Sequence, residues 1–168
     1  SASGTIGPSS SGSGATVTLS GAINATTTAD ASGNYMFTGL TNGSYTFTPS
    51  KVGFTFLPIN QAVAINGANQ SGINFTAQQV PTWNISGTIS PAGDGNGAAV
   101  MLSGAANSMV NADASGNYQF TGLVNGNYTV TPSKNGDTFT PSSRAVAVNG
   151  ASVADIDFAV TPPANTIA

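Results

Sequence analysis

The sequence contains no cysteine, no histidine and no glutamate, and charged residues occupy only 5% of its 168 positions. Without cysteine, no disulfide can supplement a hydrophobic core. Without histidine and glutamate, general acid–base catalysis would depend on aspartate or lysine, and the abundant serines and threonines have no obvious base to activate them. We therefore expect a protein that is not an enzyme and that carries no cofactor.

The scarcity of charge also limits the partners. Three basic residues, Lys51, Lys134 and Arg144, cannot form a nucleic-acid footprint, and a net charge of −3 does not favour anionic membranes. The longest apolar runs, such as residues 98–102, are far shorter than the ~20 residues that span a bilayer. Disorder is not expected either, because 39% of the residues are hydrophobic and they recur in register. The sequence predicts no nucleic-acid binding and no membrane insertion.

What the chain does have is a repeat with a constant offset of 83 residues. Three segments of the first half return almost unchanged: SGTIGP at 3–8 returns as SGTISP at 86–91, DASGNY at 30–35 returns at 113–118, and TPSK at 48–51 returns at 131–134. A repeat of this length indicates two copies of one folded module. We place the first module at residues 1–78, a short linker at 79–83, the second module at 84–160, and an extended proline-rich tail at 161–168.

Hydrophobic residues alternate with polar ones throughout both copies. Val17 and Leu19 share one face of a predicted strand, as do Tyr35 and Phe37, and the intervening residues are mostly threonine, serine and asparagine. This period of two predicts antiparallel sheets with one buried face, about seven short strands in each module, and hence a sandwich. Asn-Gly pairs at 42–43 and 125–126 predict two β-hairpins, and Pro49 and Pro132 are expected to end strands.

A longer pattern carries a family resemblance. The run comprises Asp30, Gly33, Tyr35, Phe37, Leu40, Gly43, Tyr45, Phe47 and Pro49, and it returns at Asp113, Gly116, Tyr118, Phe120, Leu123, Gly126, Tyr128, Val130 and Pro132. It resembles the carboxypeptidase regulatory-like domains of bacterial secreted proteins, whose relatives include the B-type repeats of Gram-positive adhesins and pilins. The resemblance implies an all-β chain of two tandem seven-stranded Greek-key, prealbumin-like sandwiches. It also implies a spacer, stalk or accessory role at the cell surface, since this fold alone specifies no activity.

Carboxylates offer few candidate sites. Asp30, Asp94 and Asp113 lie in predicted turns and are the candidates for calcium, but each supplies one carboxylate where calcium needs several oxygen ligands. Because Asp is an ordinary turn former, we expect turn roles and no metal. Asp155 and Asp157 are expected to share one face of a strand, where they protect an exposed edge and do not act as a glycosidase pair.

Trp83 and the tail are the candidates for contacts between modules or subunits. Trp83 falls at the module junction, and the repeat offset maps Thr166 onto Trp83 and Ile167 onto the next position, after Pro162 and Pro163. The tail thus stops where a third module would begin. Either the chain is cut from a longer tandem array, or the tail of one subunit adds a strand to the next subunit, a contact that repeats head to tail.

Two functions follow as hypotheses. The first is a non-enzymatic extracellular structural protein, a subunit or repeat unit of a bacterial surface filament or stalk that assembles end to end with copies of itself. The alternative is a carbohydrate-binding or adhesive accessory module of a larger secreted protein, with glycans as partners. The neutral polar exterior and the aromatic residues Trp83, Tyr35 and Tyr118 motivate the alternative, and aromatic side chains that point inward would count against it.

Overall fold

The structure is a computed structural model that describes residues 1–163. The chain divides into two compact units, Ser1–Val80 and Pro81–Ala168, each with a hydrophobic core of its own, and we call them the first and second modules. Strands β8 and β9 flank the division, so the predicted linker at 79–83 lends one residue to a strand at each end. No helix among the described residues has the length and apolar character needed to cross a membrane.

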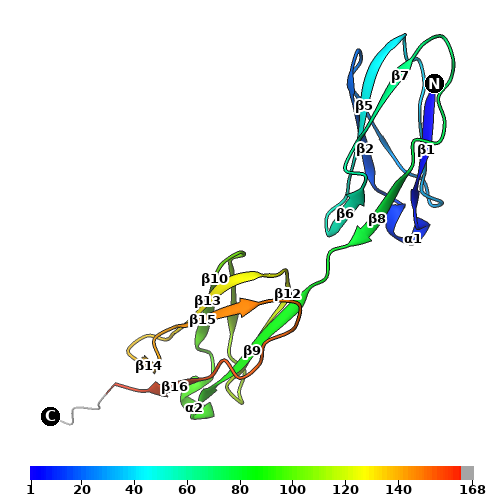
Figure 1. Ribbon diagram of the computed structural model, residues 1–168. Helices are drawn as coiled ribbons and strands as arrows, with labels where there is room; N and C mark the ends of the chain where they lie inside the picture. The colour runs from blue at the N-terminus through cyan, green and yellow to red at the C-terminus, as the bar shows by residue number, and fades with distance from the viewer. Residues whose placement is uncertain (164–168) are drawn as a thin grey trace. The chain divides into compact units, whose positions relative to one another are not determined.

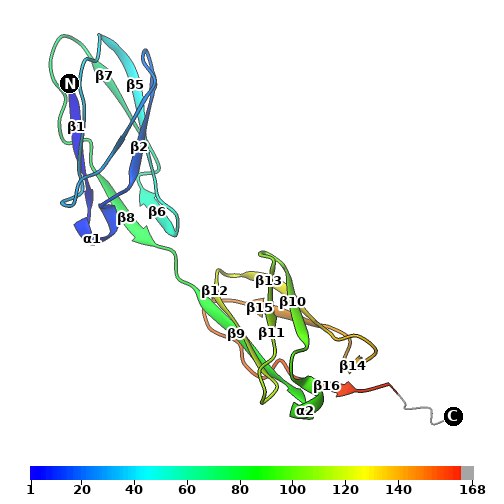
Figure 2. The same ribbon diagram turned by 180° about the vertical axis from the view of Figure 1, so that it is seen from behind.

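The first module is a sandwich of two four-stranded sheets (Figures 1 and 2). One sheet has the order β4-β1-β8-β6 and the other β3-β2-β5-β7. The strands are β1 (Ala2–Gly7), β2 (Thr16–Gly21), β3 (Ala25–Thr28), β4 (Asn34–Phe37), β5 (Gly43–Ser50), β6 (Phe54–Leu57), β7 (Gln61–Ile65) and β8 (Phe75–Gln79). Alternate residues of both sheets point into the space between them, as the period of two predicts.

The second module repeats this architecture strand for strand. Its sheets have the orders β12-β9-β16-β14 and β11-β10-β13-β15. The strands are β9 (Trp83–Ser90), β10 (Ala99–Gly104), β11 (Ser108–Asn111), β12 (Asn117–Leu123), β13 (Gly126–Ser133), β14 (Thr138–Thr140), β15 (Arg144–Val148) and β16 (Phe158–Thr161). The predicted class of two tandem β-sandwiches is confirmed, although within residues 1–163 each module has eight strands and not seven. Strand β3, with the sequence ATTT, has no large apolar side chain to reveal it.

The aromatic residues of the repeated pattern form the centre of each core. Tyr35 and Phe37 are at most 5% exposed, and so are Tyr118 and Phe120. The rings of Tyr118 and Phe120 meet edge to face with their centroids 6.0 Å apart, an arrangement that aromatic pairs favour. The inward direction that alternation predicts for these side chains is therefore confirmed.

The predicted hairpins at the Asn-Gly pairs are wrong. Strand β4 pairs with β1, whereas β5 pairs with β2 and β7, so the chain crosses from one sheet to the other at Asn42 and Gly43. The Asn42 side chain instead accepts a hydrogen bond from the Gly67 amide at 2.7 Å, and Asn125 accepts one from Gly150 at 2.8 Å. These asparagines therefore connect two loops of the sandwich. The consecutive strands that do pair with each other in an antiparallel way are β2 and β3.

Pro49 does not end its strand as predicted. It lies inside β5 opposite Val17, beyond Phe47, which is the last residue of β5 that pairs with β7. One side of β5 is open at this position, and a proline is tolerated there because it interrupts no ladder. Pro132 occupies the same place in β13, opposite Val100.

Two one-turn helices were not expected from the sequence. Helix α1 (Ser9–Gly12) and helix α2 (Ala92–Gly95) each follow a cis proline bond at the end of the first strand of their module. Lys51 donates hydrogen bonds from Nζ to the carbonyls of Ser11 and Ser13 at 2.8 and 2.7 Å. Lys134 does the same at α2, so each lysine satisfies carbonyl groups that a short helix leaves without partners.

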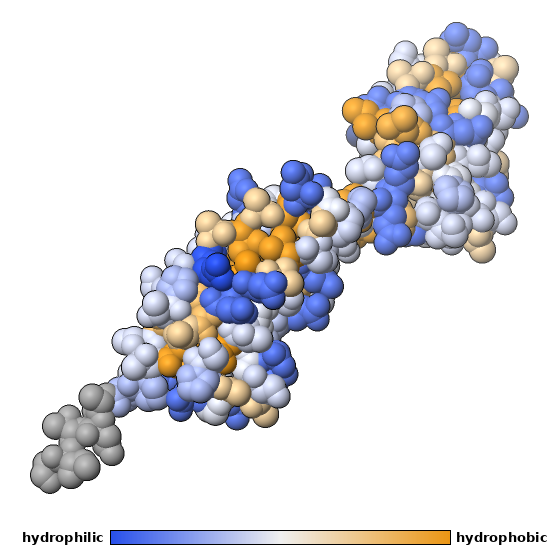
Figure 3. All heavy atoms as spheres, turned by 60° about the horizontal axis from the view of Figure 1, so that its bottom comes forward, coloured by the Kyte–Doolittle hydropathy of each residue, from blue (hydrophilic) through white to orange (hydrophobic). Residues whose placement is uncertain are grey.

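The exterior mixes polar and apolar residues and, in a sequence with 5% charged residues, carries few charges. Figure 3 shows one face coloured mostly near the middle of the hydropathy scale, with strong blue and orange in small groups. Among the exposed large hydrophobic residues are Met101 and Met109, which face each other directly across β10 and β11. The low charge of the sequence thus leaves surfaces with little electrostatic repulsion between copies.

Candidate functional site

The most distinctive feature of each module is a bulge between its first and last strands, which run parallel to each other. In the first module Ala2 faces Gln70, whereas Ile6 faces Phe75, so the later segment contains one residue more than β1 over the same stretch. The extra residue is accommodated near Gly72, whose φ of 78° is readily adopted by glycine. A bulge removes a carbonyl from the ladder, and the amide opposite then needs another acceptor.

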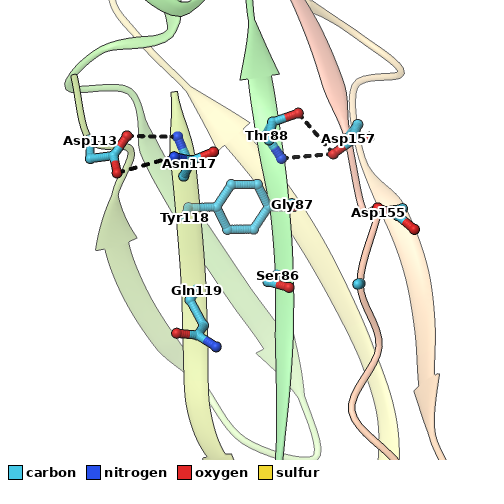
Figure 4. Close-up of a pocket in the computed structure, with 10 residues that line it drawn as sticks. Ser86, Gly87, Thr88, Asp113, Asn117, Tyr118, Gln119, Asp155 and Asp157 are labelled. Atoms are coloured by element: carbon cyan, nitrogen blue, oxygen red, sulfur yellow. Dashed lines mark hydrogen bonds between the residues drawn. The ribbon is translucent and has the colours of Figure 1, made fainter. Parts of the chain in front are cut away.

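A side-chain oxygen supplies that acceptor in both modules. The amide and hydroxyl of Thr5 both donate to Oδ1 of Asn74, at 2.9 and 3.0 Å. The amide and hydroxyl of Thr88 both donate to Oδ1 of Asp157, at 2.7 and 3.0 Å (Figure 4). We call this two-bond link the Thr–Asx contact; it joins the first strand of a module to the segment that leads into its last strand.

A buried tyrosine closes the bulge from the core side. Tyr118 extends across Gly87 (Figure 4), and its hydroxyl donates to the carbonyl of Ile156. A Cβ placed on Gly87 would lie 2.1 Å from the Ile156 oxygen and 2.9 Å from the tyrosine hydroxyl, so only glycine fits there. Burial raises the pKa of Tyr118 and keeps the phenol protonated as a donor. Tyr35 and Gly4 repeat the arrangement at Ile73.

An open polar hollow lies over each bulge. The hollow of the second module has a volume of about 500 Å³ and that of the first about 570 Å³. Three lining positions differ chemically between the copies: Met36 becomes Gln119, Gly72 becomes Asp155 and Asn74 becomes Asp157. The second hollow is therefore the more acidic, while the Thr–Asx contact is common to both.

The three calcium candidates are explained by local structure. Asp113 Oδ1 accepts hydrogen bonds from the amides of Ser115 and Asn117 at 2.8 and 2.9 Å. The Asn117 amide is the main reason that the pKa of Asp113 lies below its usual value, since it stabilises the charged form. Asp30 makes the same turn in the first module. Within the part of the chain that the structure describes, no three acidic side chains come together as a metal site.

Asp94 and the pair Asp155 and Asp157 also take structural positions. Asp94 lies in α2, where its main-chain oxygen accepts the Lys134 ammonium at 2.6 Å. The expectation that Asp155 and Asp157 share a strand face is wrong, because both precede β16 and Asp155 has a φ of 60° at the bulge. Figure 4 shows the Asp157 carboxyl directed at Thr88 and the Asp155 carboxyl turned away from it. The two carboxyl groups therefore point in different directions.

Three of the predicted contact residues, Trp83, Pro162 and Pro163, lie at the ends of the second module. Trp83 is the first residue of β9; it is half-buried against the core of the second module, and its indole nitrogen has no hydrogen-bond partner among the described residues. Pro162 and Pro163 follow β16, and the Pro163 ring lies against Gly136, with Cγ 3.5 Å from a Cβ placed on that glycine. Thr166 and Ile167 lie outside the described residues. The contact roles of these residues stay predictions.

Comparison with known families gives a match for the first module. Residues 3–78 match the family model of the carboxypeptidase regulatory-like domain. The recognition of this family from the repeated residues is thereby confirmed for the first module, and the second module shares its sheet orders and its repeated sequence. None of the curated proteins compared matches the sequence.

Several solved structures share the two-module fold. A streptococcal ancillary pilin has 14% identity and a TM-score of 0.62; the match covers 96% of this chain, which spans only 62% of the pilin. GBS52, the minor pilin of Streptococcus agalactiae, matches over the full length of both chains with 13% identity and a TM-score of 0.51. The shaft pilin SpaA from Lactobacillus rhamnosus GG matches over 99% of this chain and 98% of its own, with 12% identity and a TM-score of 0.52. At such identities the likeness establishes the fold and not the activity.

Proposed function

We propose that this protein is a non-enzymatic structural subunit or repeat unit of a bacterial surface filament or stalk, assembled end to end. The observation that carries the proposal is the duplicated set of internal hydrogen bonds. In both modules the same aspartate, tyrosine and lysine positions bind the module's own backbone: Asp30 and Asp113, Tyr35 and Tyr118, and Lys51 and Lys134. Groups that could bind a substrate or transfer a proton serve instead to hold each sandwich together.

The pilin-like fold supports an extracellular location and a structural role. A streptococcal ancillary pilin and the minor pilin GBS52 match both modules of this chain in fold. In the proposed assembly, copies of the chain contact one another head to tail through Pro162, Pro163, Thr166 and Ile167 at the end of the chain, whereas Trp83 serves the joint between the modules of one copy. A contact between different surfaces of identical subunits propagates into a filament unless it closes into a ring.

Truncation tests this assembly mechanism. We expect the full chain to form rods under negative-stain electron microscopy and a variant that ends at Thr161 to form none. Ending at Thr161 preserves all of β16, which pairs with β14 through that residue, so the second module stays intact. Circular dichroism of both proteins provides the control for folding. Filaments of the truncated variant would contradict the tail contact, and monodisperse full-length particles would contradict the filament itself.

The carbohydrate-binding alternative loses most of its motivation. Tyr35 and Tyr118 are each 4% exposed, so neither offers a free ring for a sugar to stack on, and Trp83 is half-buried against the core of the second module. A glycan array tests whether the protein binds carbohydrate without these tyrosines. Reproducible binding that disappears when Gln119 in the second hollow is replaced by alanine would favour the adhesive function over the purely structural one.

A further inference from the structure

We infer that the parallel pairing of the first and last strands makes each module a mechanical clamp that resists tension along the chain. This inference rests on the proposed function, because a stalk or filament subunit transmits tension from its neighbours through its two ends. The clamp comprises the hydrogen bonds between residues 84–90 and 152–159 in the second module, and between residues 1–7 and 69–76 in the first.

The direction of the strands determines how force acts on these bonds. In the second module the chain enters through β9 and leaves through β16, which runs parallel beside it (Figures 1 and 2). Tension therefore pulls β9 toward its amino end and β16 toward its carboxyl end, so that the two strands must slide past each other. Sliding loads all the bonds between the strands together, whereas peeling would break them one at a time.

The bonds extend along the whole overlap of the two segments. They begin at Asn84, whose amide donates to Ser152 Oγ at 2.9 Å, and end in the ladder that pairs Phe158 with Ile89 and Ala159 with Ser90. Between them lie the main-chain bonds Val153 N to Asn84 O, Ser86 N to Val153 O and Ile156 N to Ser86 O, at 2.8, 3.0 and 3.1 Å. The first module has the three corresponding main-chain bonds, Gln70 N to Ser1 O, Ser3 N to Gln70 O and Ile73 N to Ser3 O, at 3.0, 3.0 and 3.2 Å.

The Thr–Asx contact occupies the weak point of this overlap. The bulge interrupts the main-chain ladder, and Asp157 restores the connection with two bonds from Thr88. Gly87 and Tyr118 secure the same point from the core side, because the tyrosine hydroxyl binds Ile156 in the bulged segment. At this contact the two modules differ in the acceptor, which is the carboxylate of Asp157 in the second and the amide of Asn74 in the first. Hydrogen bonds to a charged acceptor are stronger than neutral ones, so this contact is the stronger in the second module.

Single-molecule pulling on the intact two-module chain, held by its ends at constant force, tests the clamp. We expect two unfolding steps, each releasing roughly 250 Å of extended chain. Asp157→Ala removes the acceptor of both bonds, and one step should then occur roughly 30-fold faster, the factor that corresponds to two hydrogen bonds of ordinary strength. The other step should keep its rate, since the first module in the same molecule is unchanged and serves as the internal reference.

Two further variants distinguish a clamp from general stability. Asp157→Asn gives the second module the acceptor of the first, and we expect an unfolding rate between those of the parent and of Asp157→Ala. Val148→Ala removes buried volume from β15, which belongs to the other sheet. It should lower the equilibrium stability in denaturant without accelerating forced unfolding to the same degree.

The clamp is overturned if Asp157→Ala leaves both forced-unfolding rates unchanged. It is also overturned if Val148→Ala speeds forced unfolding as much as Asp157→Ala at equal loss of equilibrium stability. Because the measurement uses single chains, it does not depend on assembly. Chains with an intact clamp that form no filaments would contradict the proposed function alone, and filaments of chains without force resistance would contradict the clamp alone.

Discussion

Thr88 donates two hydrogen bonds to one oxygen of Asp157, and 83 residues earlier Thr5 donates the same two bonds to Asn74. The donor residue is the same in both copies, while the acceptor changes between a carboxylate and an amide. What the position requires is therefore an oxygen at Oδ1 and not a negative charge. The bulge explains this requirement, because the oxygen replaces a missing main-chain carbonyl.

Two substitutions of Asp157 distinguish the contribution of its acceptor oxygen from that of its negative charge. Asp157→Ala should lower the free energy of unfolding of the second module by about 1–2 kcal/mol, since both bonds are solvent-exposed and of moderate strength. Asp157→Asn should cost less than ~1 kcal/mol because the amide oxygen still accepts both bonds. Chemical denaturation followed by tryptophan fluorescence reports on this module, which contains Trp83, the single tryptophan of the sequence. Equal losses in the two variants would contradict the role assigned to the oxygen.

Gly87→Ala should destabilise the second module by about 3 kcal/mol or more, because the added methyl group would collide with the backbone at Ile156. Gly93→Ala is the matched control: nothing lies within 4 Å of a Cβ at that position, and we expect a change within ~0.5 kcal/mol. Thermal unfolding of the two variants beside the parent protein makes the comparison. Similar melting temperatures for both variants would show that the close approach of β9 and the bulge is not required.

Stability should fall in acid through Asp30 and Asp113. Hydrogen bonds from the amides of Asn34 and Asn117 lower the pKa of these carboxyl groups below the ordinary value of 3.8. A carboxyl group with a lowered folded-state pKa stabilises the fold above its unfolded pKa, and this stabilisation is lost as the pH falls below about 4. The double variant Asp30→Asn, Asp113→Asn keeps the turn acceptors without a titrating group. Its unfolding midpoint between pH 5 and pH 2 should vary less than that of the parent, and an identical pH profile would refute the assignment.

Lys51 and Lys134 should differ in importance although their roles correspond. Lys51 is partly buried at its two helix carbonyls and lies 4.7 Å from the ring centroid of Phe54, whereas Lys134 is exposed and has Asp137 at the corresponding position. Lys51→Met should cost the first module about 2 kcal/mol, and Lys134→Met about 1 kcal/mol or less in the second. Hydrogen exchange of the amides in α1 and α2 measures the local effect. Equal protection after both substitutions would contradict this ranking.

Local patterns in the sequence predicted a large part of the fold. The 83-residue repeat predicted two modules, and the alternation around Tyr35 and Tyr118 predicted that these side chains point inward. Both inferences depend on short stretches of chain, since successive residues of a strand point to opposite faces wherever the strand lies. The hairpin prediction at Asn42 and Gly43 failed because it used local information for a non-local question. The Asn-Gly pair indicates a turn, but whether the next strand joins the same sheet or the other one depends on which apolar faces pack together.

The candidate site was harder to foresee because its parts are distant in the sequence. Thr88 and Asp157 are 69 residues apart, and the bulge that joins them exists only where β9 and the last segment run parallel with unequal numbers of residues. One signal was present: threonine at 5 and 88 recurs together with an Asn or Asp at 74 and 157. Asp155 and Asp157 were instead interpreted as a pair on one strand face, which requires regular strand geometry that the bulge removes.

The sequence by itself determined that there are two equivalent β-sandwich modules, which side chains fill their cores, and that little charge is left on their surfaces. Repetition and alternation are properties of neighbouring residues, so they can be seen before folding. Only the tertiary structure decided that each module begins and ends with parallel neighbouring strands joined by Thr5 with Asn74 or by Thr88 with Asp157. That pairing arises when the two sheets close over one core, because closure places segments from opposite ends of the module side by side.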